Sequence, residues 1–263
     1  FNQLLPLLIE EQQLRMCMSN WVEAKVKDVK WWTESLFSLI VNADVEPFTA
    51  GQFTKLAMQV GDKRVARAYS YVNAPNNPDL EFYLINVKDG QLSQQLAQLK
   101  PGDSVTIERR ATGFFTLDEV PSSEQLYMLS TGTALGPFIS ILEQGEVWQK
   151  FEHVHLVHGV RFNEDLSYQE RIKALQQQYP NLCYSPVVSR ESATIGFNGR
   201  ITDVIKDHRL FDVIGRPTVP DTAQFMICGN PQMVKDTTAI LLELGFSRNR
   251  RREPGQITVE QYW

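Results

Sequence analysis

The sequence is poor in cysteine, and its few cysteines are far apart. Cys17, Cys183 and Cys228 form no Cys-x-x-Cys pair anywhere in the 263 residues. This spacing offers neither a recognisable zinc site nor a cysteine-ligated iron–sulfur cluster. An odd number of cysteines without a pairing pattern suits a reducing compartment, so we expect a cytoplasmic protein.

Long apolar runs and excess positive charge are also missing. No run approaches the roughly 18–20 apolar residues that a membrane-spanning helix requires. The 26 Lys and Arg residues against 31 Asp and Glu give a net charge of −5. We therefore expect no membrane and no nucleic-acid partner. The 43% hydrophobic and 22% charged residues are typical of a globular chain, with length for one large domain or two.

Residues 1–17 read differently from the rest. The segment has no basic start and no small-residue cleavage site, so it is not a good signal peptide. Met18 begins a stretch that reads as a natural start, and we interpret 1–17 as an N-terminal extension. The alternative is a true helix with Leu4, Leu7, Leu8 and Leu14 on one face.

The first part of the chain, to about Leu117, has the pattern of short strands separated by turns. Six runs carry β-branched, aromatic or alternating residues: VEAKVKDV, SLFSLIV, FTKLAMQV, RVARAYSYV, LEFYLINV and DSVTIERR. Six strands this close together predict an antiparallel barrel. Leu92, Leu96 and Leu99 fall at helical spacing and predict one helix between the strands.

After about Pro121 strands and helices alternate. LYMLS, HVHLVHG, LCYSPVVS and AQFMICG are each followed by a helical pattern. This alternation predicts an α/β domain with a parallel sheet. We place one domain at 18–118 and the other at 119–263. Ligands bind such sheets outside the carboxyl ends of the strands, so the residues just after each strand are the first candidates for a site.

Several of those residues suit a phosphate. STGTALGP, at 130–137, has a glycine at a strand-to-helix turn, where free backbone N–H groups favour an anion. Taken alone, this turn fits an ordinary strand-to-helix connection as well as it fits a phosphate-binding loop. Arg161, Arg190 and Arg200 each follow a strand or begin a helix, and together they favour a polyphosphate. Ser189 beside Arg190 suits a 2′-phosphate on adenosine.

In the barrel, RAYS at 67–70 sets a cation beside an aromatic ring. Alternation puts Arg67 and Tyr69 on one face and sends Ser70 to the other, unless the strand ends, twists or bulges there. A pyrophosphate with a flat ring would suit the first face. Taken alone, a core tyrosine and a surface arginine explain the pattern better.

HVHLVH could suggest a metal site, but the run is a strand. His153 and His155 then share one face, and His158 takes the other. No carboxylate is placed nearby in sequence. We therefore predict structural histidines and no metal.

Seven separated motifs resemble those of the bacterial ferredoxin–NADP(+) reductases, also called flavodoxin reductases. They are RAYSYVN, LEFYLINVKDGQLSQQL, GFF with LDEV, STGTALGP, VVSRE, CGNPQMV and VEQYW, in this order between Met18 and Trp263. The resemblance implies an FAD-binding barrel, an NADP(H)-binding α/β domain and electron transfer from NADPH to ferredoxin or flavodoxin. It also implies a monomer.

The resemblance implies a role for individual residues. Arg67 would contact the FAD pyrophosphate, Tyr69 would lie on the isoalloxazine, and Ser70 would sit near its N5 atom. Further FAD-binding positions follow: Ala68, Tyr83, Leu84, Ile85, Gln91, Leu92, Ser93 and Thr133. Positions matching the NADP site are Arg161, Ser189, Arg190, Arg200, Asn230, Pro231, Gln232 and Asp236.

The chain ends on Trp263, a large apolar residue where small polar ones are usual. The resemblance implies that this indole stacks on the flavin face opposite Tyr69 and moves aside for the nicotinamide. Cys228 would lie near the nicotinamide, although a small buried side chain explains it too. Glu260 would assist protonation at the flavin.

An acidic carrier would need a basic patch on this acidic chain, and Arg109-Arg110 and Arg248–Arg252 are candidates. An alternative within the same fold is an NAD(P)H:flavin or quinone reductase that needs no carrier protein. A non-catalytic flavin-binding module is a third interpretation, which the arginines of the second domain disfavour.

Overall fold

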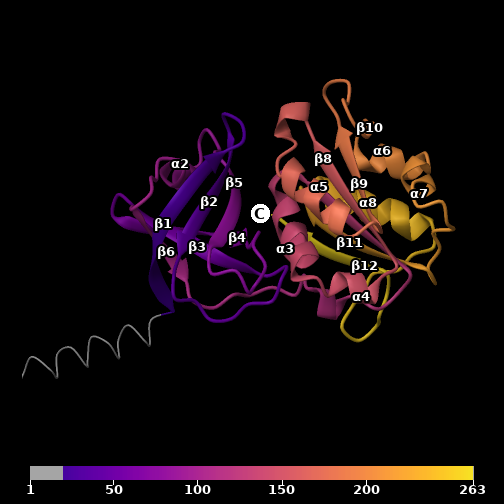
Figure 1. Ribbon diagram of the computed structural model, residues 1–263, viewed down its shortest axis with the longest axis horizontal. Helices are drawn as coiled ribbons and strands as arrows, with labels where there is room; N and C mark the ends of the chain where they lie inside the picture. Colours follow the sequence, from indigo (N-terminus) through magenta and orange to yellow (C-terminus); the bar gives the residue numbers. More distant parts are fainter. Residues whose placement is uncertain (1–19, 263) are drawn as a thin grey trace, which may run out of the picture.

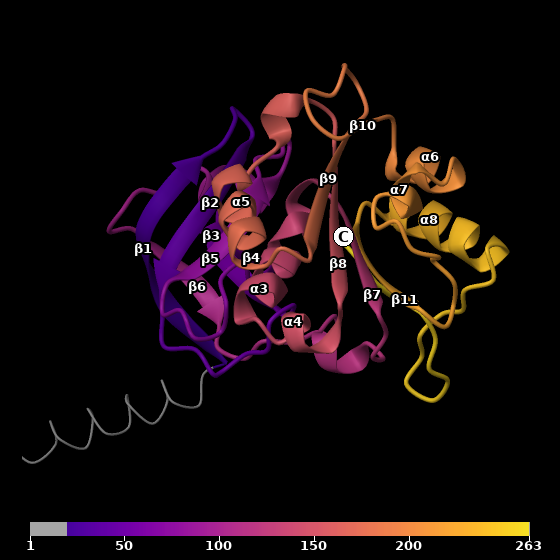
Figure 2. The same cartoon turned by 45° about the vertical axis from the view of Figure 1, so that its right-hand side comes forward.

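The computed structural model describes residues 20–262, which form two lobes lying side by side (Figure 1). The first lobe contains β1 to β6, and the second contains β7 to β12 with helices on both faces of the sheet (Figures 1 and 2). The extension predicted at 1–17 lies outside the described residues.

The first lobe is a curled antiparallel sheet with strand order β4-β3-β6-β1-β2-β5. Its elements are β1 (Trp21–Trp31), β2 (Leu36–Asn42), β3 (Phe53–Val60), β4 (Lys63–Ser70), β5 (Leu80–Ile85), α2 (Gln91–Leu96) and β6 (Ser104–Glu108). Just after β4, a bridge between Tyr71 and Phe82 joins the chain to β5. The sheet is therefore almost closed, and the predicted six-stranded antiparallel barrel with one helix is confirmed.

Alternation along the strands builds the barrel core. Phe37, Leu39 and Val41 on β2 are fully buried inside it. Ser38, on the opposite face of the same strand, is also fully buried, because that face packs against the second lobe. A small polar residue in the middle of a strand thus marks the side on which the two lobes meet.

The second lobe is a parallel sheet with strand order β10-β9-β8-β7-β11-β12. Its strands are β7 (Gln125–Thr131), β8 (His153–Val160), β9 (Leu182–Val188), β10 (Phe197–Asn198), β11 (Ala223–Gly229) and β12 (Ile257–Gln261). The chain builds outward from β7 in one direction and then returns to its other side with β11. This switch between β7 and β11 is where ligands bind in sheets of this kind.

Helices cover both faces of this sheet. They are α3 (Gly136–Gln144), α4 (Val147–Lys150), α5 (Gln169–Gln178), α6 (Ile201–Lys206), α7 (Arg209–Asp212) and α8 (Pro231–Glu243). Short 3-10 turns, η1 (Leu117–Glu119), η2 (Gly132–Leu135) and η3 (Asn163–Asp165), lie in the connections. Buried side chains of α3, α4 and α5 share one cluster, and those of α6, α7 and α8 share another.

The four predicted strand–helix units are present, and the predicted α/β parallel-sheet domain is confirmed. Two strands were not predicted. β10 is only two residues long, and β12 includes part of the terminal VEQYW motif, for which no strand was predicted. The boundary between 118 and 119 stays a prediction, since η1 spans it.

One apolar cluster crosses between the lobes. Val72, Tyr83 and Phe115 from the barrel side pack with Phe138 and Leu135 of the second lobe. Rings of Phe115 and Phe138 meet edge to face at 5.4 Å. No helix among residues 20–262 has the length and apolarity needed to cross a membrane.

We predict that Phe138→Ala lowers the free energy of unfolding by about 3–5 kcal/mol, because its fully buried ring fills the cluster shared by both lobes. Urea unfolding followed by tryptophan fluorescence measures this change. Phe114→Ala is the matched control, since its ring is 75% exposed, and we expect a change within about 0.5 kcal/mol. Equal effects of the two changes would contradict this packing.

Candidate functional site

A cleft of about 860 Å³ opens at the carboxyl edge of the parallel sheet, against the barrel. The turn Thr33–Leu36 and Ile85 form its barrel wall. The ends of β7, β8, β9 and β11, with the start of α8 and Tyr262, form the other wall. The cleft therefore lies at the switch point of the sheet, where the order of its strands reverses.

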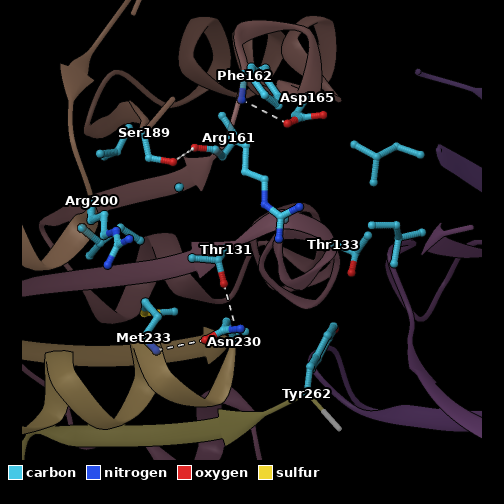
Figure 3. Close-up of a pocket in the computed structure, with 18 of the residues that line it drawn as sticks. Thr131, Thr133, Arg161, Phe162, Asp165, Ser189, Arg200, Asn230, Met233 and Tyr262 are labelled. Carbon is cyan, nitrogen blue, oxygen red and sulfur yellow. Dashed lines mark hydrogen bonds between the residues drawn. The ribbon is translucent and has the colours of Figure 1, made fainter. Parts of the chain in front are cut away.

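Arginine side chains reach this cleft from two elements. The guanidinium of Arg161, just after β8, points into the cavity, and Arg200 lies across from it at the start of α6 (Figure 3). Arg190 does not line the cleft, although its backbone N–H bonds the Arg161 carbonyl at 2.9 Å. The two cleft arginines supply the positive charge that a phosphate group requires.

Ser189 lines the cleft, but its hydroxyl proton is already used. Its Oγ donates to the backbone oxygen of Val160 at 3.0 Å. Oγ can therefore accept a hydrogen bond from a ligand as it lies, and it must rotate before it can donate one to a phosphate.

The start of α8 supplies the predicted Asn-Pro-Gln segment. Asn230 caps this helix, its Oδ1 accepting the N–H groups of Gln232 at 3.0 Å and Met233 at 3.3 Å. Pro231 takes the first helical position, where no backbone N–H is needed. Gln232 donates to Asp236 at 2.7 Å, one turn along the helix. Asn230, Gln232 and Asp236 all line the cleft, whereas Pro231 does not.

The ends of β7 and β11 touch so closely that a glycine is required. A Cβ at Gly229, which has φ +136°, would lie 2.2 Å from Thr131 Oγ1. That oxygen accepts the N–H of Asn230 at 3.0 Å (Figure 3). Thr133, from the following turn, lies in the same cavity toward the barrel (Figure 3). The STGT turn is thereby fixed to the start of α8 at the floor of the cleft.

On the barrel side, β4 presents Arg67 and Tyr69. Arg67 and Ala68 are exposed and Tyr69 is half-buried. Burial raises the pKa of Tyr69 to about 12, partly offset by the Arg67 charge, so its hydroxyl stays neutral. Strand β4 ends at Ser70. Because the strand stops there, Ser70 can reach the boundary with the second lobe although alternation puts it on the face opposite Arg67 and Tyr69.

The side chains of Tyr83 and Leu84 are buried and cannot contact a ligand as they lie. Tyr83 is 4% exposed and its hydroxyl bonds Ser167 at 2.7 Å, while Leu84 is 1% exposed in the barrel core. A ligand contact at these two positions would have to be made by the backbone, because both side chains are buried. Ile85, the next residue, does line the cleft.

At α2 the side chains are again occupied. Leu92 and Ser93 are buried, and Ser93 Oγ accepts the N–H of Val87 at 3.2 Å. Gln91 begins the helix. A ligand role here would rest on the backbone N–H groups of the first helical turn.

The last strand brings acidic and aromatic groups to the meeting of the lobes. β12 pairs in parallel with β11, and this register sets Glu260 beside Cys228 and Gln261 beside Gly229. A methyl group at Gly113 of the barrel-side loop would lie 3.6 Å from Glu260 Oε1. Burial raises the pKa of Glu260 to about 7. Burial, reinforced by the Glu260 charge, raises the pKa of the Cys228 thiol well above its ordinary value.

Tyr262 is the site residue that the sequence interpretation passed over. Its hydroxyl donates to Ser70 Oγ at 2.9 Å, and its N–H bonds the Gly229 carbonyl at 3.1 Å. The end of the described chain accordingly lies between the two lobes (Figure 1). The VEQYW motif contains this residue, but nothing near it in the sequence indicates its contact with Ser70, 192 residues earlier. Trp263 lies outside the described residues.

Two of the three histidines of β8, His155 and His158, make side-chain hydrogen bonds within the protein. His155 Nε2 bonds Ser185 Oγ at 2.8 Å, and His158 Nε2 bonds the Gly132 carbonyl at 3.0 Å. Burial lowers the pKa of both to about 4, so both rings are neutral at pH 7. Among residues 20–262 no group of three His, Cys, Asp or Glu side chains is arranged to hold a metal ion.

Comparisons with known proteins agree with this geometry. The chain is 51% identical over 248 residues to a flavodoxin/ferredoxin–NADP reductase of Escherichia coli (strain K12), covering 94% of this chain and 100% of the relative. A ferredoxin–NADP reductase of Pseudomonas aeruginosa is 34% identical, over 93% of this chain and 98% of the relative. The chain belongs to the flavodoxin/ferredoxin–NADP reductase family.

The two lobes of this reductase match two family descriptions. Residues 10–114 match the oxidoreductase FAD-binding domain, and residues 128–239 match the oxidoreductase NAD-binding domain. A crystal structure of a ferredoxin NADP+ reductase from Neisseria gonorrhoeae, with bound FAD and NADP, is 36% identical with a TM-score of 0.89. That match covers 93% of this chain and 100% of the other. The two predicted cofactors, FAD and NADP(H), thus agree with the fold.

We predict that Glu260→Gln stabilises the protein at pH 8 and has little effect at pH 4.5. Burial raises the Glu260 pKa to about 7 from 4.5, so the unfolded chain releases this proton first. The resulting loss of stability is absent below about pH 4.5, grows through the interval, and is complete above about pH 7. Urea unfolding across this range measures the effect.

The matched control is Glu253→Gln, which removes an exposed carboxylate with little expected change in stability. A Glu260→Gln difference that is constant from pH 4.5 to 8 would contradict the raised pKa.

Proposed function

We propose that this reductase takes electrons from NADPH through bound FAD and delivers them to ferredoxin or flavodoxin. The observation that supports this best is the cleft itself, which has arginines at the strand ends on one side and the barrel on the other. When bound, FAD accepts a hydride from the nicotinamide and releases the electrons one at a time. The residues of the chain bind, orient and shield these groups.

For NADP(H), the residues present fit a dinucleotide. Arg161 and Arg200 would bind phosphate oxygens as charged forks. Arg190 would approach the 2′-phosphate from beside the cleft, and Ser189 would donate to it after its hydroxyl rotates away from Val160. Gly229 makes room for Thr131 Oγ1, which accepts the Asn230 N–H, so the strand ends meet tightly where the coenzyme would bind. Asn230, Pro231, Gln232 and Asp236 would shape the nicotinamide end through the fixed start of α8.

For FAD, we propose that Arg67 binds the pyrophosphate and that Tyr69 covers the ring. Ser70 and Tyr262, hydrogen-bonded to each other, would sit at the reacting edge. Glu260, with its raised pKa, would hold a proton at its carboxyl oxygen near neutral pH. Cys228 would line the same region as a neutral thiol. The remaining predicted contacts are Ala68, Leu84, Ile85, Gln91, Leu92, Ser93, Tyr83, Thr133 and Trp263.

Carrier docking is proposed at the basic residues outside the cleft. Arg109 is less available than its neighbour, since it pairs with Asp44 at 3.2 Å and is 22% exposed. Arg110 and Arg248–Arg252 are therefore the stronger candidates, with Arg250 also near Glu253 at 3.6 Å. We further propose a monomer in the cytoplasm, in line with the free cysteines Cys183 and Cys228.

A carrier assay separates this function from a flavin or quinone reductase. We predict NADPH-dependent reduction of flavodoxin or ferredoxin at a rate comparable to that of a small dye, and a carrier rate that falls steeply between low and high salt. Arg110→Ala with Arg251→Ala should weaken carrier turnover at low salt and leave dye reduction unchanged. Turnover with quinones alone, or equal salt dependence in both assays, would contradict carrier docking.

Coenzyme choice tests the arginine assignments. We predict that Arg190→Ala and Arg200→Ala each lower kcat/KM for NADPH by about 10- to 100-fold, the value of one or two charge-assisted hydrogen bonds, with little change for NADH. Steady-state kinetics with both coenzymes measures the ratio.

Arg209→Ala is the control, because that exposed arginine pairs with Asp207 away from the cleft. If the two coenzymes lose activity equally, the 2′-phosphate is bound elsewhere.

A further inference from the structure

One arginine bonds carboxylates from both domains. Arg171 of α5 donates from Nη1 to Glu81 of β5, in the barrel, at 2.6 Å. Its Nε and Nη2 donate to the two carboxyl oxygens of Glu143, on α3 of its own domain, at 2.8 and 2.7 Å. The three side chains are 14–30% exposed, so water screens these pairs less than it screens surface pairs. Arg171 therefore ties α5 to the barrel as well as to α3.

A directed chain of hydrogen bonds ends on the same carboxylate. Tyr168 donates to Glu81 Oε1 at 2.8 Å, which uses its only proton. Ser38 must then donate to Tyr168 across 2.6 Å, and Trp32 Nε1 donates to Ser38 Oγ at 2.9 Å. Tyr168 is 2% exposed and Ser38 is fully buried. Each donor thus has a defined acceptor, which fixes the direction of the whole chain.

Tyr168 also adopts an unfavourable backbone conformation. Its φ is +63°, in the left-handed region, at the residue before α5 begins. Such a conformation persists when the surroundings over-determine it. Both ring neighbours of Tyr168 belong to the barrel: Trp32 lies at 4.6 Å and Tyr83 lies edge to face at 5.0 Å, while Arg171 of α5 lies over the same ring at 5.3 Å. The start of α5 is therefore held by the neighbouring domain.

This network adjoins both walls of the cleft. Trp32 immediately precedes the turn Thr33–Leu36 on the barrel wall. Tyr168 follows Glu164 and Asp165 of the opposite wall by a few residues. The network is therefore placed between the two walls of the cleft.

We propose that Glu81, Tyr168 and Arg171 are positioning residues that set the orientation of the two domains across the cleft. The apolar cluster between the lobes supplies attraction without direction, whereas these polar contacts are satisfied in one arrangement only. A misplacement of about 1 Å between reacting groups lowers a rate by about 100-fold. The inference deepens the proposed function, since it concerns the alignment of coenzyme and flavin.

The test compares Glu81→Leu and Tyr168→Phe with the matched control Glu143→Leu. The first two break contacts between domains, and the control breaks a contact of the same arginine within one domain. On the FAD-loaded full chain we would measure kcat and KM with NADPH and a small dye, and the affinity for 2′,5′-ADP by calorimetry. Hydrogen exchange of the amides in Thr33–Leu36 and Glu164–Tyr168 reports the domain contact without activity.

We expect the two interdomain variants to lower kcat at saturating NADPH by about tenfold or more, in line with a small misalignment. Affinity for 2′,5′-ADP, which needs only the second domain, should stay within about twofold, and exchange in both segments should accelerate. Glu143→Leu should change kcat by less than about twofold. A general loss of folding would instead weaken 2′,5′-ADP binding too.

Unchanged kcat in both interdomain variants, or an equal loss in Glu143→Leu, would overturn the proposal. If Glu81→Leu does not fold, Tyr168→Phe decides, because it removes only a hydroxyl. If the unaltered protein oxidises no NADPH, the proposed function fails, and unaccelerated exchange in the variants would independently overturn the domain contact.

Discussion

The parallel pairing of β7, β11 and β12 is the interaction on which the site depends. It sets Cys228, Glu260 and Tyr262 at one edge, and the Tyr262 hydroxyl then reaches Ser70 of the barrel at 2.9 Å. The close approach of Gly229 to Thr131 lets these strand ends lie side by side. Because the sheet reverses its order between β7 and β11, the same edge carries the open cleft. The last strand of the chain thus completes the second domain and also brings it into contact with the first.

Two kinds of interaction join the domains: apolar burial, which stabilises their contact, and directed polar contacts, which select its orientation. Fully buried side chains such as Phe138 supply most of the attraction, since burial of apolar area is favourable in any orientation. Directed contacts, among them Tyr262 with Ser70 and Arg171 with Glu81, select one orientation. Glu260, in contrast, destabilises the folded state. Burial raises its pKa to about 7, so the protein loses folding stability above its ordinary pKa in order to keep a carboxyl group that is partly protonated near neutral pH.

Much of the fold and part of the site could be predicted from the sequence, wherever a residue pattern within one segment determines its structure. Alternation located the six barrel strands, and strand–helix alternation located the parallel sheet and the edge bearing Arg161 and Arg200. Contacts between distant segments could not be predicted that way. Nothing near Ser38 in sequence indicates that its hydroxyl bonds Tyr168, 130 residues later. Tyr83 and Leu84 match a motif, yet their side chains are buried, because a motif shows which residues recur and not which atoms face a ligand. Tyr262 could not be predicted for the same reason, because its partner Ser70 lies 192 residues earlier in the sequence.

The central claim is that coenzyme and flavin meet in the cleft between the domains. The most direct test is a visible absorption spectrum of the protein after incubation with FAD, recorded under anaerobic conditions before and after adding NADPH. The account predicts a bound flavin whose absorption is lost rapidly with NADPH and much more slowly with NADH. A protein that takes up no FAD, or a bound flavin that NADPH does not bleach, would contradict it.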